Sequence, residues 1–533
     1  MTRGARTTLA GLLAVAAALA TTELVNLLTP TRPSLLLGVQ VWFIETFSAS
    51  LKDLAVQLFG TQDKAALEIG AFLVALAFGP LTSRLEVRRR GAGAAMIGAF
   101  GVLGVLATLR HPQASGAVTV LAGLLGAAVG IATLWLLLDR FGLRVAPGAE
   151  RLFRDRRPAA SPPTDDPYGG AAVGQVAGTR REVILWGLGA GAAVATAGAL
   201  AKGVGDASRE AQAVIPDSIP APAAPASLPA APPFETPGLS PYIVRNEDFY
   251  LIDTSPQPPY VVTDQWTLKI TGMVDTELSF SYEDLLARDL VEEVVTLSCV
   301  SNEVGGNLVG NARWTGIPLR TLLEEAGVQA GATQLVGEAV DGFTAGFPTS
   351  ALDDLERTAL VAVGMNGQPL PRAHGFPARL VVSGLYGYVS ATKWLSEIRL
   401  TTLDDEDGYW ISRGWAKEAP VKTQSRIDVP RNRANVMAGL VPIAGVAWAP
   451  SRGIQKVEVR IDGDDWMEAD LGRVASDDTW VQWHVGWQAE AGDHEIQVRA
   501  TDGDGETQGE DPVAPIPDGA EGWHTRQVRV AEA

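Results

Sequence analysis

Residues 296–302 read Thr296-Leu297-Ser298-Cys299-Val300-Ser301-Asn302 and contain the only cysteine of this 533-residue chain. Shortly afterwards the chain reads Gly310-Asn311-Ala312-Arg313-Trp314-Thr315-Gly316-Ile317-Pro318-Leu319. A single thiol cannot form an intramolecular disulfide, and five histidines offer it few partners for a zinc or iron–sulfur cage. One thiolate can still attack a substrate, or bind a metal that arrives with its other ligands attached. From composition alone, a buried structural cysteine is the commonest interpretation.

The flanks of Cys299 favour a metal ligand instead, because they resemble the molybdenum-binding segment of the sulfite oxidase family. Three further segments resemble that family in the same order along the chain. They are residues 245–253, residues 365–379 and residues 384–395. The resemblance covers residues 240–530 and implies a cysteine thiolate on a molybdenum that a pterin dithiolene already holds. A sulfur ligand is the expected choice for a metal bound by other sulfurs.

The resemblance implies molybdenum-molybdopterin as the cofactor, with Cys299 as its metal ligand and as the catalytic residue. The terminal phosphate of a pterin needs cationic and hydroxyl donors close to backbone amides. Arg379 offers a bidentate fork, and Ser390, Thr392 and Lys393 lie on a Gly-flanked loop. The predicted cofactor-binding residues are Asn246, Phe249, Tyr250, Asp341, His374, Arg379, Ser390, Thr392 and Lys393.

Each of these residues also has an ordinary interpretation when it is taken alone. Arg379 and Lys393 would more often be surface ion-pair residues, and His374 a satisfied structural histidine. Tyr386 and Trp394, in the same segments, are interpreted as core aromatics. The order and spacing of the four segments together favour the cofactor site.

The substrate is predicted from the positions where this chain departs from the family. Sulfite oxidases surround their anion with several arginines and place a tyrosine near the molybdenum. Here Ser301-Asn302-Glu303-Val304 replaces their Gly-Asn-Arg-Arg pattern, Leu251-Ile252 replaces an expected arginine, and Val363-Gly364 replaces an expected tyrosine. Each lost charge-assisted hydrogen bond removes roughly 1.5–3 kcal/mol of anion binding. An uncharged oxide, such as a sulfoxide or N-oxide, therefore suits the site better than sulfite as the small-molecule oxo donor or acceptor.

Two hypotheses of other classes stay open at this point. The first is a cofactor-free binding or scaffold protein that retains the sulfite oxidase fold. The second is a cysteine-nucleophile hydrolase, which needs a Cys–His pair, and His374 is the only histidine of the catalytic segment. A nucleic-acid partner is not expected, because the formal net charge is −18 and phosphate binding demands a basic face.

The first 210 residues are apolar with arginine clusters and predict a multi-pass membrane domain. About 20 apolar residues cross a bilayer. Five stretches approach or reach that length: residues 8–28, 66–81, 92–109, 118–138 and 183–201. Arginines concentrate before the first stretch, between the second and third, and between the fourth and fifth, which places those connections in the cytoplasm. Membrane lipid is therefore an expected partner, and the chain after residue 202 is expected on the extracytoplasmic side.

The fifth apolar stretch has two interpretations. Its start, Thr179-Arg180-Arg181-Glu182-Val183-Ile184-Leu185, resembles a twin-arginine export signal. The alternative is ordinary positive charge ahead of a membrane helix. Because the twin-arginine route carries folded proteins, it suits an enzyme whose cofactor is inserted in the cytoplasm, and the resemblance to a molybdenum enzyme favours it.

The membrane domain is predicted to carry no redox centre of its own. His111 is the only histidine before residue 374, so a bis-histidine haem is not expected. One cysteine also excludes a Cys-x-x-Cys-His haem attachment motif and a cysteine-held iron–sulfur cluster. Electrons are therefore expected to pass to or from a separate protein, such as a cytochrome or a quinone-linked carrier.

The remaining sequence predicts three more parts. Residues 211–239 form a Pro/Ala-rich linker, with eight prolines after residue 212. Residues 240–403 mix short strands and helices and predict an α+β domain of sulfite oxidase type. Residues 404–533 contain short alternating strands with Asp-Gly turns, which favours an immunoglobulin-like β-sandwich. In the family that this chain resembles, such a sandwich often mediates dimerisation, so a homodimer is compatible with the sequence.

Overall fold

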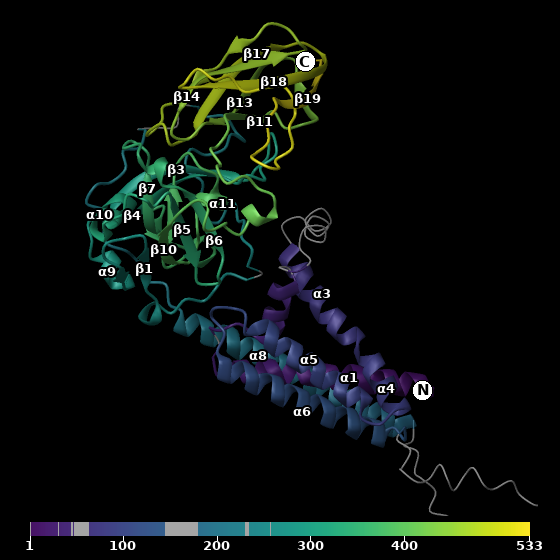
Figure 1. Cartoon of the computed structure of the whole chain (residues 1–533). Helices are drawn as coiled ribbons and strands as arrows, with labels where there is room; N and C mark the ends of the chain where they lie inside the picture. The colour runs from purple at the N-terminus through teal and green to yellow at the C-terminus, as the bar shows by residue number, and fades with distance from the viewer. Residues whose placement is uncertain are drawn as a thin grey trace, which may run out of the picture. The chain divides into compact units, whose positions relative to one another are not determined.

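The computed structural model describes residues 2–29, 31–43, 46, 63–143, 180–229, 234–255 and 257–532. The chain divides into two compact units (Figure 1). The first comprises Met1–Gln212 with Ser255–Gln257, and the second comprises Ala213–Thr254 with Pro258–Ala533. Most of the predicted cytoplasmic connection before the twin-arginine segment lies outside the described residues.

The first unit is helical, with α1 packed against α4, α6 and α8. Its helices are α1 (Arg3–Asn26), α3 (Asp63–Ala77), α4 (Gly79–Arg88), α5 (Ala92–Thr108), α6 (Gly116–Arg140) and α8 (Arg180–Gln212). Small residues allow the close approach. A Cβ on Gly11 of α1 would overlap the backbone of Gly79 in α4, and one on Gly130 of α6 would lie 2.9 Å from Ala18 of α1. Such small-residue contacts are typical of packed membrane helices.

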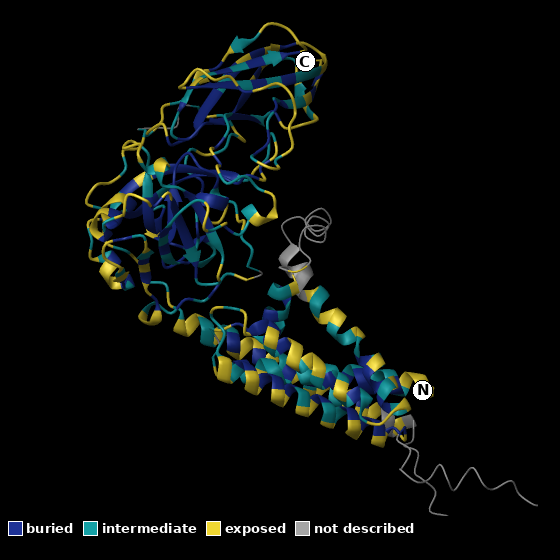
Figure 2. Ribbon diagram, viewed as in Figure 1, coloured by how far each residue is buried: buried dark blue, intermediate teal, exposed yellow. Residues whose placement is uncertain are grey.

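Four helices of the described chain are long and apolar enough to cross a membrane, and α5 is a shorter apolar helix of 17 residues. The four candidate spans are Arg3–Asn26, Ile69–Arg88, Gly116–Arg140 and Ile184–Gln212. The helices carry many exposed residues (Figure 2), and apolar Val102, Leu106 and Leu124 are among them. The predicted N-terminal apolar helices are therefore confirmed, and they are compatible with a membrane protein.

Glu86 is a buried acid inside the second candidate span, and its carboxylate closes the start of α5. The carboxylate accepts backbone N–H groups from Gly91, Gly93 and Ala94 at 3.1 Å, and the indole N–H of Trp135 at 2.9 Å. A negative charge is favourable at a helix N-terminus, where backbone N–H groups lack intrahelical partners. Glu86 thus links α4, α5 and α6 through a charge that is fully hydrogen-bonded.

The first half of the second unit contains one antiparallel sheet and one mixed sheet, in which β1 and β10 are parallel. One sheet has the order β3-β4-β7-β8, with β9 beside β7, and the other has the order β2-β1-β10-β5-β6. Their strands are β1 (Leu268–Gly272), β2 (Leu278–Phe280), β3 (Val291–Ser298), β4 (Val309–Pro318), β5 (Gln334–Ala339), β6 (Thr344–Pro348), β7 (Ala359–Met365), β8 (Gln368–Pro369), β9 (Arg379–Val382) and β10 (Leu395–Thr401). The helices are α9 (Tyr282–Leu286), α10 (Leu319–Ala326) and α11 (Gly387–Ser390).

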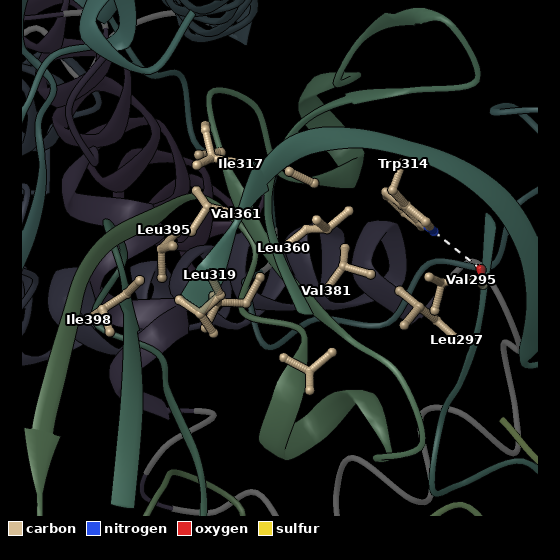
Figure 3. Close-up of a cluster of buried hydrophobic side chains, with 14 of the residues drawn as sticks. Val295, Leu297, Trp314, Ile317, Leu319, Leu360, Val361, Val381, Leu395 and Ile398 are labelled. Atoms are coloured by element: carbon tan, nitrogen blue, oxygen red, sulfur yellow. Dashed lines mark hydrogen bonds between the residues drawn. The ribbon is translucent and has the colours of Figure 1, made fainter. Parts of the chain in front are cut away.

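A continuous hydrophobic core joins these elements, and Figure 3 shows part of it. Trp314 is fully buried, and its indole N–H donates to the carbonyl oxygen of Val295 on the neighbouring strand at 3.2 Å (Figure 3). Leu360 and Val381, on the paired strands β7 and β9, pack in the same cluster. This rigid core fixes the ends of β3 and β9, from which Cys299 and Arg379 are presented.

The second half of the unit is β-sheet-rich, as predicted. Its strands are β11 (Gln424–Val429), β12 (Ala434–Met437), β13 (Gly439–Trp448), β14 (Ile454–Ile461), β15 (Met467–Glu468), β16 (Asp470–Leu471), β17 (Val481–Ala489), β18 (Gly492–Asp502) and β19 (His524–Ala531). They form two sheets, β11-β13-β17-β16 and β12-β19-β18-β14-β15, that share one hydrophobic cluster. Trp483 from the first sheet and Val498 from the second are both fully buried there. The immunoglobulin-like assignment of this region stays a prediction.

Part of the proline-rich linker is docked rather than free. The amide of Ala223 donates to Leu290 and the amide of Glu292 donates to Ala224, both at 2.8 Å. Ile219 packs against the core of the second unit. The linker therefore adds a short extended segment beside the start of β3.

Candidate functional site

Cys299 lies immediately after β3, at the start of a loop that returns to β4. The side chain is buried, and the backbone is held at three points. The Cys299 amide donates to Leu308 at 2.9 Å, and the amide of Asn302 donates to the Cys299 carbonyl at 3.0 Å. The amide of Leu308 in turn donates to the side-chain oxygen of Asn302 at 2.8 Å. The loop is therefore closed on itself, and the sulfur has a defined position.

Two tyrosines lie within electrostatic reach of the thiol. Burial raises the pKa of Tyr250, the charge of Cys299 raises it further, and Arg379 opposes the rise. Burial also raises the pKa of Tyr386 to about 12, and Cys299 again adds to the shift. A Cβ on Gly387 would lie 3.7 Å from the Tyr250 hydroxyl, an ordinary van der Waals distance, so the start of α11 lies next to this phenol. Both tyrosines are therefore neutral hydrogen-bond donors close to the sulfur.

The segment that carries Asn246, Phe249 and Tyr250 is joined to His374. The Phe249 ring stacks on Tyr250, with ring centroids 5.2 Å apart, and meets the His374 ring edge-on at 5.7 Å. His374 Nε2 lies 2.7 Å from the carbonyl oxygen of Asn246. Burial lowers the pKa of His374 to about 4, so the ring is neutral at pH 7. Because its partner is a carbonyl, Nε2 carries the ring proton and donates it.

Arg379 is the most unusual charge in the site. It is 5% exposed, and its guanidinium donates to the carbonyl oxygens of His374 at 3.0 Å and Ala391 at 3.4 Å. One face lies 4.8 Å from the centre of the Trp314 ring. No carboxylate of the described residues forms an ion pair with it, and burial lowers its pKa to about 10. A buried cation without a counter-charge is costly, so this position favours an anionic ligand.

Lys393 and Asp341 lie beside this cation in a second charged group. Lys393 Nζ forms a 2.7 Å ion pair with Asp253, and both side chains are nearly buried. Burial raises the pKa of Asp341 to about 6, and Asp253 raises it further while Lys393 opposes the rise. Gly375, with φ of 114°, lies between Arg379 and Lys393. A Cβ at this position would lie 3.1 Å from the Cβ of Arg379 and 3.2 Å from the Cβ of Lys393. The two predicted cations therefore occupy neighbouring positions.

The predicted hydroxyl donors have backbone partners in this structure. Ser390 Oγ donates to the carbonyl oxygens of Leu385 and Tyr386 at 3.2 and 3.1 Å, and Thr392 Oγ1 donates to Gly337 at 3.4 Å. Both side chains are fully buried. Their hydroxyl protons thus stabilise the loop around α11, and direct contact of Ser390 or Thr392 with a cofactor stays a prediction.

Two neighbours were missed by the sequence analysis. Asp253 pairs with Lys393, and Tyr386, interpreted only as a core aromatic, lies near Cys299 as well as in the core. An acid following the conspicuous Phe249-Tyr250 pair could have suggested a partner for one predicted cation. No such signal existed for Tyr386, because its packing depends on residues far away in the sequence.

The donor set fits a molybdenum pterin. The described residues contain no group of three or more His, Cys, Asp or Glu side chains that could hold a metal by themselves. A metal at Cys299 must therefore bring other ligands, which a dithiolene does. The buried guanidinium of Arg379 and the nearby Lys393 suit a phosphorylated anion, and the neutral His374 and Asn246 suit a polar ring.

Acidification should destabilise the cofactor-free protein between pH 6.5 and 4. Burial lowers the pKa of His374 and of His524 to about 4, whereas an unfolded histidine titrates near its usual value of 6.5. Stability is therefore present above pH 6.5 and is lost as the pH falls toward 4, by about 3 kcal/mol for each histidine. The pKa of Asp341 is raised to about 6, so this carboxyl has the opposite effect. As the pH falls from 6 to 4, it adds about 3 kcal/mol to the stability of the folded protein, which offsets the loss from one histidine.

This balance can be measured by following the midpoint of thermal unfolding of the full chain in detergent from pH 7.5 to 4.5. The His374→Gln variant should lose less stability than the original protein across this range. Parallel curves for the two proteins would contradict a buried neutral His374.

Comparison with known proteins identifies relatives for this region. The family of the oxidoreductase molybdopterin binding domain matches residues 255–410. Mitochondrial sulfite oxidase of Homo sapiens is 32% identical over 336 residues, which cover 54% of this chain and 60% of that protein. The chain thus spans less than two thirds of these sulfite oxidases. The uncharacterized oxidoreductase YuiH of Bacillus subtilis is 34% identical over 168 residues, 31% of this chain and 80% of that protein. Among solved structures, the sulfane dehydrogenase SoxCD of Paracoccus pantotrophus matches with a TM-score of 0.48 at 23% identity, covering 56% of this chain and 86% of that one.

Proposed function

Because this chain belongs to the sulfite oxidase family of molybdopterin-dependent oxidoreductases, we propose that it is a membrane-anchored enzyme that exchanges an oxygen atom with an uncharged substrate. The observation that carries the proposal is the buried guanidinium of Arg379 near Tyr250, whose phenol also lies within electrostatic reach of Cys299. A site with one soft ligand and one unneutralised cation suits a metal complex that carries its own phosphate group.

The residues of this chain divide the work of holding that complex. Cys299 would supply the protein's bond to molybdenum, and Arg379 would neutralise the phosphate, with the Lys393–Asp253 pair beside it. His374 donates from one nitrogen to Asn246, which fixes the ring and leaves the other nitrogen as an acceptor. When it is bound, the cofactor supplies two-electron oxygen-atom transfer, and the protein supplies orientation and electrostatics.

An uncharged oxide is the proposed substrate class. Tyr250 and Tyr386 provide neutral donors near the sulfur, and phenols of raised pKa can hydrogen-bond to the oxygen of a sulfoxide or N-oxide without carrying charge. Leu251 and Ile252, which occupy the position of an expected arginine, are about half exposed and apolar. Glu303, at the position of another arginine, adds a negative charge that disfavours sulfite.

The membrane unit is proposed to anchor the enzyme, with the catalytic unit on the extracytoplasmic side and the twin-arginine segment as its export signal. A separate carrier, either a cytochrome or a quinone-linked protein, would then exchange electrons with the site. A homodimer formed through the C-terminal sheets is compatible with this arrangement.

Metal analysis and a substrate panel test the proposal together. We expect about one molybdenum per chain after expression in a host that makes the cofactor and exports by the twin-arginine route. The kcat/KM for reduction of a sulfoxide or trimethylamine N-oxide by a reduced viologen dye should exceed that for sulfite oxidation by at least about tenfold, the effect of one lost charge-assisted bond. Absence of molybdenum would support the scaffold alternative. Molybdenum together with a preference for sulfite would overturn the substrate class alone.

A further inference from the structure

The loop that follows Cys299 is held from outside by the C-terminal β region. His524, the first residue of β19, is buried, and its ring lies directly on Gly305. Gly305 has φ of 72°, and a Cβ at this position would overlap the imidazole ring. Only glycine therefore allows the loop and the ring to occupy their observed places.

A second residue of the β region holds the next carbonyl of the loop. Arg426 of β11 donates from Nη1 to the carbonyl oxygen of Gly306 at 2.8 Å. Its other nitrogens are fixed by Asp428 at 2.7 Å and by the Ser240 hydroxyl at 2.9 Å. The arginine is buried, so this contact is not in competition with solvent.

The two holding residues come from strands β11 and β19, which belong to different sheets and contact each other. The amide of Ile427 donates to Nδ1 of His524 at 2.9 Å, which fixes the ring plane. Arg526 donates to the carbonyl oxygen of the same Ile427 at 3.3 Å. Hydrogen bonds between the two sheets thus fix the imidazole against β11, the strand that carries the guanidinium.

Tyr386, a neighbour of the thiol, contacts the same β region. The Tyr386 hydroxyl packs against Gly519, in the connection between β18 and β19 that ends at His524. The amide of Lys422, just before β11, lies 3.4 Å from that hydroxyl. The loop after Cys299 and its neighbour Tyr386 therefore both contact residues more than a hundred positions later than Cys299 in the chain.

We propose that His524 and Arg426 are positioning residues, which hold the 299–308 loop so that Cys299 is presented to the molybdenum. The C-terminal β region then completes the catalytic site in addition to any part that it has in assembly. The inference rests on the proposed function for the identity of the metal. The contacts of His524 and Arg426 with the 299–308 loop, here called the clamp, can be tested without any metal.

The test uses the single thiol as its own reporter. The full-length chain in detergent, produced in a host that lacks the pterin cofactor, is labelled with iodoacetamide at Cys299 and followed by intact mass. Gly305→Ala should raise the labelling rate about tenfold or more, because the loop opens when the ring is displaced. Gly505→Ala is the matched control, since Gly505 lies in the same β18–β19 connection with φ of 85° and has open space around its Cβ position. Its rate should stay within about twofold of the original.

A double variant separates the clamp from general loss of stability. His524→Asn keeps an acceptor for the Ile427 amide and removes the ring volume above Gly305. If ring and loop are coupled, adding Gly305→Ala to His524→Asn should change the labelling rate by less than about twofold. Arg426→Gln should also accelerate labelling. Equal rates for Gly305→Ala and Gly505→Ala, or effects that simply multiply in the double variant, would overturn the positioning role.

Molybdenum content in a cofactor-producing host distinguishes the two proposals. If the original protein binds molybdenum and Gly305→Ala binds less, both proposals are supported. If the original protein binds none while labelling still separates the two glycine variants, the clamp stands and the proposed function falls. If molybdenum binds normally and labelling does not change, only the positioning role falls.

Discussion

Replacing Cys299 by serine should reduce oxygen-atom transfer by more than about 100-fold, since loss of outer partners of a metal ligand alone costs 10- to 100-fold. Serine is nearly the same size as cysteine, so the buried site should keep its shape. Its oxygen is a hard donor, however, and it stays protonated at pH 7, so it is a poor ligand for a metal bound by sulfurs. The measurement is kcat/KM on the substrate panel together with X-ray absorption at the molybdenum edge, which should show one sulfur neighbour fewer.

Ser301→Ala is the matched control for this variant, because Ser301 lies on the same loop and is exposed. Its activity and metal content should match those of the original protein. An active Cys299→Ser enzyme with an unchanged absorption spectrum would show that the sulfur does not bind the metal. Loss of activity with a normal sulfur count would point to a role of the thiol other than ligation.

Replacing Arg379 by methionine should release the cofactor while leaving the cofactor-free protein folded. The guanidinium is buried without a carboxylate partner in the described chain, so its removal from the empty site relieves a desolvation cost. In the loaded enzyme the same change leaves a phosphate without its partner. Breaking such a buried pair costs about 3–5 kcal/mol, or about 100-fold to several thousandfold in cofactor affinity.

The two halves of this prediction need separate measurements. The thermal midpoint of the cofactor-free variant should stay close to that of the original, and molybdenum should be lost during gel filtration of the loaded variant. Arg379→Lys should retain part of the cofactor, because it keeps the charge but not the bidentate fork. Arg320→Met, at an exposed position on α10, should change neither property. A strongly destabilised cofactor-free Arg379→Met would mean that the arginine serves the fold through its carbonyl contacts instead.

Much of the site could be predicted because its residues lie in short segments with recognisable flanks. Cys299 and Arg379 each stand at the end of one strand, so a local pattern was sufficient to single them out. The family was confirmed, and the matching family model covers residues 255–410, which include Cys299 and Arg379. In the C-terminal region, alternation of apolar and polar residues predicted short strands, and the structure is β-sheet-rich there.

The roles of individual polar groups were harder to predict from the sequence. Ser390 and Thr392 were expected to donate to a phosphate, but their hydroxyl protons are used on backbone carbonyls of their own neighbourhood. Asp253 pairs with Lys393 across 140 residues, and no local pattern reveals such a pair. Glu86 lies in a segment whose charges suggested only a cytoplasmic boundary, yet it caps α5 inside the helical unit.

The sequence by itself indicated the family, the apolar N-terminal helices and Cys299 as the candidate metal ligand, because composition and flanking residues act over a few positions. Only the tertiary structure revealed that Arg379 has no acidic partner among the described residues and that His524 and Arg426 hold the loop of Cys299. Burial and long-range contacts arise when distant strands pack together. A hydrogen bond between residues 120 positions apart leaves no trace in the local pattern of either one.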